Sequence, residues 1–366
     1  MIRTVIVGGG MVGLTLARLL RARGHDPVVL ERAPAGVWMP RGFMLGYQGY
    51  DAFEELGLLS RLRAAGRDVG TGPDGVPVGI AVDYGIVMGT LAEDVPVAHG
   101  EAVVALLRDG DRVTGVVTEG PGGRADVAAD LVVACDGRAS AVRDMAGIPS
   151  ELSPLRDAYL GFLSPTAPRQ LFGFRYLSDG GMITMLGWPE GSSGSRRVDP
   201  VGRDAATAPD IGVFTRTFAE LLPEAEEIVG AITSWDQVRY TEPALLRCPS
   251  WWVPGVVAIG DSAHTFGPDT GVGAGIGLQD AHALAEAIGR APDADAACES
   301  YATWREPAVR PYEAMDPAWR HGRDPPGGAG RAVAPGLIPA PPGRDAGGPV
   351  SRRGAASPPA RCPPGR

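Results

Sequence analysis

The sequence predicts an α/β fold in which a parallel sheet covered by helices is joined to a second sheet. Three apolar runs, beginning at residues 2, 131 and 255, each lead into a glycine-containing turn and then into a stretch with helical apolar spacing. A further stretch, residues 170–190, has alternating apolar and aromatic residues on both sides of a turn sequence, which is typical of a hairpin. The 366 residues are enough for two domains.

The first stretch reads VIVGGGMVGLTLARLL and runs from residue 5 to residue 20. It is neither a signal peptide nor a membrane-spanning helix, because three consecutive glycines interrupt it and arginines follow just downstream. As a strand, turn and helix it places Gly8, Gly10 and Gly13 in the pattern G-x-G-x-x-G. The first glycine allows a tight turn, the second lets backbone amides approach a pyrophosphate, and the third lets the helix pack closely on the strand.

A second strand, residues 27–30, ends at Glu31. Glu31 follows Gly13 by eighteen residues, close to the ~20 expected for a carboxylate that binds the hydroxyls of an adenosine ribose. The strand, glycine turn, helix and acidic strand end together predict a Rossmann-like dinucleotide cradle. On these residues alone the dinucleotide is either FAD or a nicotinamide.

Two later segments indicate a flavin. LVVACDGRASAVRDMAG, residues 131–147, runs from a strand into Asp136-Gly137, and GVVAIGDSAHTFGPDTGVGAGIGLQDAHALAEAI, residues 255–288, runs from a strand into Gly260-Asp261. With the N-terminal turn, they resemble in order and spacing the fingerprints of the class A flavoprotein monooxygenases, the p-hydroxybenzoate hydroxylase-like family. The resemblance implies FAD as the bound cofactor and NAD(P)H as a dissociable co-substrate.

The chemistry of the last segment agrees with the resemblance. Asp261 can accept a hydrogen bond from a ribityl hydroxyl, and Gly271 and Gly273 allow backbone amides to approach the flavin. Pro268 would stiffen the loop beside the flavin ring, and the resemblance implies that the Asp136 segment serves both FAD and NADPH. The expected cofactor-binding residues are Gly8, Gly10, Met11, Val12, Gly13, Glu31, Arg32, Arg41, Asp136, Gly260, Asp261, Pro268, Gly271, Val272 and Gly273.

One position departs from the family pattern. The family usually has an arginine at the start of an R-x-x-L-x-x-x-L helix near the flavin, and the matching segment here, residues 84–91, begins with Tyr84. This replacement puts one contact to the flavin or to NADPH in doubt. Arg41 matches an early family arginine near the cofactor and is the residue that would compensate.

The family pattern implies a discontinuous FAD-binding domain made of residues 1–71, 99–163 and 251–316. Residues 72–98 and 164–250 would form a β-sheet substrate domain, interleaved with the first, that covers the flavin. The hairpin turn Ser178-Asp179-Gly180-Gly181 supports this sheet. One face should line the substrate cavity, although the sequence leaves the strand parity open; the candidate lining residues are Arg175, Met182, Thr184, Met185, Trp188 and Tyr240.

The composition changes at residue 317. Residues 317–366 hold twelve Pro, ten Gly, nine Ala and eight Arg but no Glu, so they cannot bury enough apolar surface to offset their ordering entropy and are expected to be disordered. A frameshift in GC-rich DNA would produce this composition, and a genuine low-complexity tail is the alternative.

Composition also excludes several classes of protein. The chain has no lysine, so a P-loop or Schiff-base mechanism is impossible. None of the four cysteines forms a C-x-x-C pair and none of the five histidines has metal-ligand spacing, which indicates a reducing cytoplasm and no metal. The tail carries a net charge of +6 and the rest of the chain −15, so the body does not bind nucleic acid. Oligomeric state is not determined by these features.

The predicted function is an FAD- and NAD(P)H-dependent monooxygenase that hydroxylates a phenolic or polyketide-type aromatic substrate. In the resembling family, a flavin C4a-hydroperoxide transfers oxygen from O2 while the protein excludes water. The catalytic residues remain unknown, because no general base can be identified and the local Ser262 and His264 pair lacks a G-x-S-x-G elbow. A halogenase would need a lysine. An epoxidase, a double-bond reductase and a non-catalytic flavin- or ligand-binding protein remain as alternatives.

Overall fold

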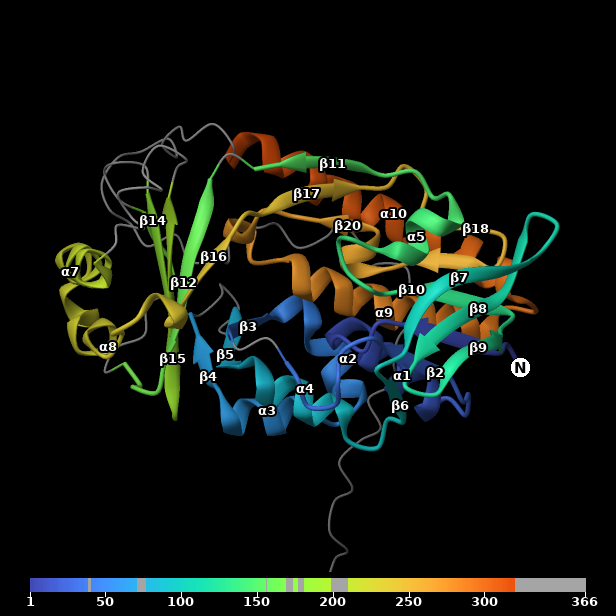
Figure 1. The fold of residues 1–366 in the computed structure, drawn as a ribbon, viewed down its shortest axis with the longest axis horizontal. Helices are drawn as coiled ribbons and strands as arrows, with labels where there is room; N and C mark the ends of the chain where they lie inside the picture. The colour runs from blue at the N-terminus through green and yellow to red at the C-terminus, as the bar shows by residue number, and fades with distance from the viewer. Residues whose placement is uncertain are drawn as a thin grey trace, which may run out of the picture.

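The computed structural model describes residues 1–38, 41–70, 77–155, 157–168, 174–176, 181–198 and 210–319. A six-stranded sheet forms its core, in the order β18-β19-β10-β1-β2-β6, and all neighbours run parallel except β18 and β19. The parallel sheet confirms the predicted α/β fold (Figure 1). The strands are β1 (Thr4–Val7), β2 (Val28–Glu31), β6 (Val97–His99), β10 (Leu131–Ala134), β18 (Trp252–Val253) and β19 (Val256–Ala258).

Helices and a small sheet bury this core. β1 and β10 are buried along their whole length, as expected for short apolar strands covered on both faces. Helix α1 packs against α9, and α9 packs against α10, while a three-stranded antiparallel sheet contacts β10 through β8. The elements are α1 (Met11–Ala22), α5 (Ala141–Ala146), α9 (Gly273–Arg290), α10 (Ala294–Trp319), β7 (Ala102–Asp109), β8 (Arg112–Gly120) and β9 (Gly123–Ala128).

A five-stranded antiparallel sheet, in the order β13-β14-β15-β12-β16, forms the other end of the molecule (Figure 1). Helices α7 and α8 lie on its outer side and bury a separate apolar core around Phe162, Phe214 and Phe218. The elements are β12 (Ala158–Ser164), β13 (Phe174–Tyr176), β14 (Met182–Trp188), β15 (Gly191–Val198), β16 (Val238–Thr241), α7 (Ile211–Leu221) and α8 (Glu226–Gly230).

Two three-stranded sheets and three helices join these two parts. The β3-β5-β4 sheet contacts β14 on the inner side of the five-stranded sheet, and β11-β17-β20 extends along the top of Figure 1. These elements are β3 (Gly42–Gly46), β4 (Arg67–Val69), β5 (Gly79–Asp83), β11 (Glu151–Pro154), β17 (Ala244–Arg247), β20 (His264–Thr265), α2 (Tyr50–Glu55), α3 (Leu59–Ala65), α4 (Tyr84–Ala92), and the 3-10 turns η1 (Tyr47–Gly49), η2 (Pro223–Ala225), η3 (Trp235–Gln237), η4 (Gly260–Ser262) and η5 (Pro268–Thr270).

Two strands belong to a different sheet from the one that the sequence suggested. β6 pairs with β2 in the parallel sheet, although residues 97 and 98 were expected in the substrate domain. β12 pairs with β15 and β16 in the five-stranded sheet, although residues 158–163 were expected in the FAD-binding domain. Strand partners distant in sequence decide sheet membership, and local apolar patterning carries no information about them.

Two further predictions from the sequence fall only partly within the described residues. Helix α10 extends to Trp319, across the expected start of the tail at residue 317, and the remainder of the tail, residues 320–366, lies outside the described residues. The turn of the expected hairpin at residues 178–180 also lies outside them, but β13 and β14 on either side do pair antiparallel.

Candidate functional site

The turn between β1 and α1 combines a close backbone approach with open space. Gly8 has a φ of 113°, and a Cβ atom there would lie 2.2 Å from the carbonyl oxygen of Cys135. A Cβ at Gly13 would lie 2.0 Å from the carbonyl oxygen of Gly8. At Gly10, the N-cap of α1, a Cβ would meet no atom within 4 Å. The N-terminus of α1 therefore faces open space, in which an anion can be held.

Glu31 lies at the carboxyl end of β2 with its carboxylate fixed by two backbone amides. Gly9 N donates to Oε2 and Ala33 N donates to Oε1, each over 2.8 Å. A cavity of about 330 Å³ lies in front of this strand end. Five residues expected to bind a dinucleotide line it, and they come from three separate strand ends: Gly8, Gly10, Glu31, Arg32 and Asp136.

The cavity has a further wall that sequence reasoning missed. Glu101, directly before β7, and Ala102 and Val103 at its start also line the cavity, as do Ala139 and Ala141 of the segment after Asp136. The strand pattern of residues 102–109 gave no signal for this role, because the wall is created by the packing of the small sheet against the core.

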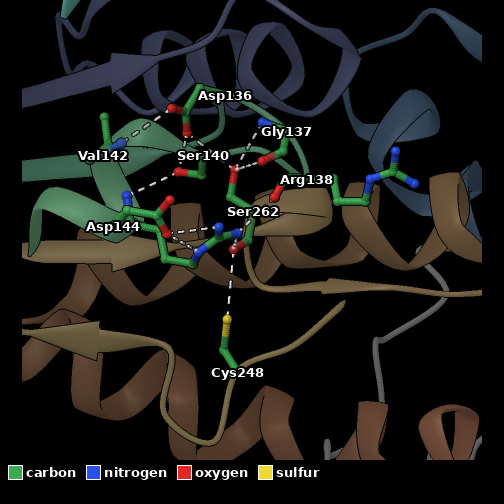
Figure 2. A network of polar contacts seen from close by, with 9 residues as sticks. Asp136, Gly137, Arg138, Ser140, Val142, Asp144, Cys248 and Ser262 are labelled. Carbon is green, nitrogen blue, oxygen red and sulfur yellow. Dashed lines mark hydrogen bonds and ion pairs between the residues drawn. The ribbon is translucent and has the colours of Figure 1, made fainter. Parts of the chain in front are cut away.

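Asp136 holds its own loop together. Its Oδ1 accepts hydrogen bonds from Ser140 Oγ and, over 3.4 Å, from Ser262 Oγ, while Oδ2 accepts from Val142 N over 3.3 Å. Ser262 is fully buried and also accepts from Gly137 N over 3.0 Å. Figure 2 shows these contacts, in which Ser262 joins the loop after β10 to the loop after β19.

Arg143 also joins these two loops. Its side chain is 5% exposed, and Nη1 donates to the carbonyl oxygens of Arg138 over 2.9 Å and Ser262 over 3.3 Å. The other guanidinium nitrogens pair with Asp144. Local sequence patterns do not reveal these roles of Ser262 and Arg143, because the contacts span 125 and 119 residues of sequence.

The turn after β19 is held by a buried ion network. Gly260 N donates to Oδ2 of Asp280 over 3.0 Å, and the same oxygen lies 2.7 Å from Nε2 of His264. Arg305 Nε donates to the other oxygen of Asp280 over 2.9 Å. Burial acts to raise the pKa of Asp280, but its contacts with His264 and Arg305 and the hydrogen bond from Gly260 N outweigh it, so the pKa of this carboxyl is lowered. Asp280 therefore stays ionised and anchors the turn.

Asp261, which this turn presents, is exposed to solvent, although neighbouring protein atoms partly desolvate its carboxyl. Burial raises the pKa of its carboxyl, and the nearby His264, Arg41 and Arg138 side chains oppose this effect only in part. An accessible carboxylate in surroundings of this kind is suited to accept hydrogen bonds from a bound ligand.

The glycine-rich segment after Asp261 has two structural uses. Gly271 has a φ of 62° and ends the turn that begins at Pro268, so that Val272 can cap α9. Further along α9, a Cβ at Gly275 would lie 2.8 Å from Cβ of Gln48, and a Cβ at Gly277 would lie 2.8 Å from a Val12 methyl. The later glycines thus permit close helix packing, whereas a Cβ at Gly273 would meet nothing nearer than 3.9 Å.

Comparison with known proteins identifies the family to which this geometry belongs. A family model described as FAD binding domain matches residues 1–73 and 88–314. The chain belongs to the FAD-binding-domain family of FAD-dependent monooxygenases.

Two relatives and one solved structure illustrate the similarity. The monooxygenase is 31% identical over 350 residues to protoasukamycin 4-monooxygenase of Streptomyces nodosus subsp. asukaensis, across 83% of this chain and 84% of that protein. It is 27% identical over 330 residues to rifampicin monooxygenase of Streptomyces venezuelae, across 80% of this chain and 66% of that protein. It shares its fold with P. aeruginosa PqsL, solved in complex with 2-aminobenzoylacetate, with a TM-score of 0.76, 22% identity, and coverage of 87% and 95% of the two chains.

The residues of the monooxygenase fit FAD. The open space at Gly10, the anchored carboxylate of Glu31 and the exposed carboxylate of Asp261 supply, in order, a site for an anion and two acceptors for hydroxyl groups. All three follow parallel strands, whose carboxyl ends meet at one edge of the sheet. A dinucleotide with two sugar-like parts on either side of a pyrophosphate matches this order.

Arg41 and Tyr84 are direct neighbours. The guanidinium carbon of Arg41 lies 4.0 Å from the centroid of the Tyr84 ring, and Tyr84 N donates to the carbonyl oxygen of Arg41 over 3.1 Å. A cation held over an aromatic face is attracted by the ring quadrupole. The tyrosine that replaces the usual family arginine therefore holds a different arginine at the start of α4.

Strand pairing shows which way the expected substrate-lining residues face. Directly paired residues of an antiparallel sheet share a face, and the row that joins Arg175, Ile183, Leu160 and Tyr240 points to the helical side. Met185 shares this face and packs in the core with α7.

Arg175 also pairs with Glu224, over 2.7 Å, in the turn between α7 and α8. The prediction that Arg175, Met185 and Tyr240 share the inner face with the other candidates is therefore wrong. They lie on the outer face, toward α7 and α8, because the sequence does not determine the strand parity.

Met182, Thr184 and Trp188 lie on the inner face. Trp188 is 4% exposed, and its ring lies 3.1 Å from where a Cβ of Gly42 would be, at the start of β3. Gly42 follows Arg41 directly, so this end of the inner face meets the segment that carries Arg41. These three residues are the part of the expected substrate surface that the structure places toward the cofactor domain.

The described residues contain neither a membrane-spanning helix nor a cluster of metal ligands. Within residues 1–319, apart from the gaps given above, no helix combines the length and apolar character needed to cross a membrane. The same residues contain no group of three or more His, Cys, Asp or Glu side chains arranged to hold a metal ion.

Proposed function

We propose that this FAD-dependent monooxygenase hydroxylates an aromatic substrate of phenolic or polyketide type, with NAD(P)H as reductant and O2 as oxygen donor. The observation that carries the proposal is the convergence of Gly10, Glu31, Asp136 and Asp261 at one sheet edge, beside a second sheet whose inner face carries Trp188. FAD, when bound, supplies the redox chemistry, by accepting a hydride from NAD(P)H and activating O2.

In this proposal each part of the chain holds one part of FAD. The turn from Gly8 to Gly10 and the N-terminus of α1 would bind the pyrophosphate, and Glu31 would accept from the adenosine ribose. Asp261 would accept from a ribityl hydroxyl. The backbone from Gly271 to Gly273 would face the flavin ring, where the absence of side chains allows close approach.

The remaining task of the protein is to hold the substrate and keep water out. Met182 and Trp188 supply apolar surface on the inner face, and Thr184 between them supplies a hydroxyl. An aromatic ring with a polar substituent matches this combination, because apolar walls exclude water while a single polar group fixes orientation.

The test is product formation by the purified, FAD-loaded protein. NAD(P)H oxidation and O2 uptake should both increase on addition of phenolic compounds, and 18O2 should label the hydroxylated product. Oxidation of NAD(P)H without O2 uptake would support a double-bond reductase instead. If no aromatic compound stimulates NAD(P)H oxidation, the hydroxylase proposal is wrong and a binding role is favoured.

A variant pair strengthens the test. Asp261→Asn keeps the size of the side chain but removes the accepting charge, and should weaken FAD binding about tenfold, the loss of one charge-assisted hydrogen bond. Asp236→Asn is the control, because Asp236 is exposed in η3, directly before the edge strand β16 of the five-stranded sheet.

A further inference from the structure

Three buried polar atoms beside the Asp280 network have no hydrogen-bond partner among the described residues. They are Nε1 of Trp251, Nδ1 of His264 and the hydroxyl of Tyr301. The side chains are at most 1% exposed. The Trp251 ring contacts the other two rings in tilted arrangements, with its centroid 5.1 Å from that of His264 and 5.8 Å from that of Tyr301. Unpaired buried polar atoms are costly, and internal water is their usual partner.

The chemistry of each side chain decides which of these three atoms donates a hydrogen bond and which accepts one. Indole Nε1 can only donate, and burial raises the pKa of Tyr301 well above its ordinary value, so its hydroxyl keeps its proton. Asp280, an ionised carboxylate paired with Arg305, can only accept, so Nε2 of His264 carries the proton directed at it. In a neutral ring, Nδ1 is then an acceptor.

Two donors and one acceptor are the complement of a single water molecule. Water can accept from Trp251 and Tyr301 while it donates to His264, and buried waters typically make about three hydrogen bonds. We propose that one internal water bridges these three side chains and fixes the Nε2–H tautomer of His264. His264 then acts as a positioning residue for the turn that carries Asp261.

The link from His264 to the turn runs through one atom. Oδ2 of Asp280 accepts from Nε2 of His264 over 2.7 Å and from the Gly260 amide over 3.0 Å. Rotation of the imidazole would displace the oxygen that holds Gly260 and, with it, the next residue, Asp261. The consequence for FAD rests on the proposed function, whereas the water and the tautomer do not.

The direct test is a crystal structure that resolves ordered water, together with 15N NMR of the histidine side chains. We expect a water within about 3.2 Å of all three atoms and a His264 signal with protonated Nε2 and unprotonated Nδ1. Tyr301→Phe removes one water partner and should shift this signal toward a mixture of tautomers. The proposal would be overturned by a crystal structure with no water among the three side chains, by a protonated Nδ1, or by an unchanged His264 signal in Tyr301→Phe.

The functional test measures FAD affinity. His264→Leu removes the donor to Asp280 and should raise the dissociation constant of FAD about tenfold, as expected for a lost buried hydrogen bond. His264→Gln, whose amide can still donate, should stay within about threefold of the wild type. His282→Gln is the matched control, because His282 also pairs with a carboxylate, Glu55, over 2.8 Å, but at the surface.

Each outcome decides a separate question. Equal loss of affinity in His264→Gln and His264→Leu would contradict the positioning role, as would wild-type affinity in His264→Leu. If His264→Leu does not fold, His264→Gln is compared with His282→Gln. A loss of FAD affinity in His264→Gln but not in His282→Gln would then show that a hydrogen-bond donor to Asp280 is not sufficient for the role of His264. Failure of the wild-type protein to bind FAD would contradict the proposed function but leave the water and the tautomer to be tested by crystallography and NMR.

Discussion

Gly10 and Gly13 are three residues apart in one glycine pattern, yet their surroundings in the structure differ. A Cβ at Gly13 would collide with the Gly8 carbonyl at 2.0 Å, whereas a Cβ at Gly10 would enter open space. The fold therefore needs Gly13, whereas we propose that FAD binding needs Gly10. Both glycines fit one sequence pattern, and only the three-dimensional surroundings separate their roles.

This difference predicts opposite phenotypes for two alanine variants. Gly13→Ala should lower the free energy of unfolding by about 1–3 kcal/mol or more, because a backbone atom cannot move aside. Gly10→Ala should unfold like the wild type but bind FAD weakly. Gly89→Ala, at an exposed position in α4, is the control for both measurements. Urea unfolding and FAD titration check the pair, and equal effects on stability would contradict the assignment.

The charge of Asp280 predicts a pH dependence of stability. Burial opposes ionisation, but His264 and Arg305 hold the pKa of this carboxyl below its usual value of 3.8. A lowered folded-state pKa means that the contribution is complete above the usual pKa and is lost as the pH falls through the folded-state value.

Asp280→Asn should therefore cost about 3–5 kcal/mol at pH 7, the range for breaking a buried ion pair. The difference from the wild type should shrink only below about pH 4. Urea unfolding of both proteins between pH 3 and pH 8 checks this, and a difference that disappears near neutral pH would contradict it.

At the scale of elements, the glycines of α9 set how closely this helix approaches α1 and η1. Gly277 faces Val12, and Gly275 faces Gln48. The close packing places the N-terminus of α9 next to that of α1, at the same edge of the sheet. A helix with alanine at these positions would have to move away from both neighbours.

Gly277→Ala should destabilise the protein by about 1–3 kcal/mol, because its Cβ would lie 2.8 Å from a Val12 methyl. Val12→Ala removes that methyl, so the double variant should lose less than the sum of the two single variants. A double-mutant cycle measures the difference, expected at about 0.5–3 kcal/mol. Strict additivity would show that this contact does not limit the helix packing.

Local patterns in the sequence predicted the parallel sheet and the glycine turn, because a strand, its turn and the next helix are adjacent in the chain. They did not predict that Ser262 would bind Gly137, or that Arg305 would pair with Asp280, since those contacts depend on the complete fold. The parity of β14 and β16 was equally inaccessible, because apolar residues lie on both faces of this sheet.

The whole molecule places a sheet with two different faces beside the cofactor domain. Its outer face packs on α7 and α8, and its inner face meets β3 and β5 (Figure 1). The substrate is expected on the inner side. Two aromatic residues, Trp188 on the inner face and Tyr240 on the outer face, allow this arrangement to be tested.

Trp188→Ala should uncouple the reaction, so that NAD(P)H is oxidised with little hydroxylated product, because water gains access to the inner face. Tyr240→Ala should lose some stability but keep the ratio of product to NAD(P)H. Product yield per NAD(P)H, with melting temperature as a check on folding, distinguishes the variants. A loss of coupling in Tyr240→Ala alone would reverse the assignment of the two faces.

An equilibrium titration of the purified protein with FAD tests whether the carboxyl edge of the parallel sheet binds this cofactor. We expect saturable binding of one FAD per chain, with a shifted visible flavin spectrum, and a clear loss of affinity in Gly10→Ala while Gly89→Ala binds normally. A folded protein that takes up no FAD, or a Gly10→Ala variant that binds it as tightly as the wild type, would refute binding of FAD at this edge.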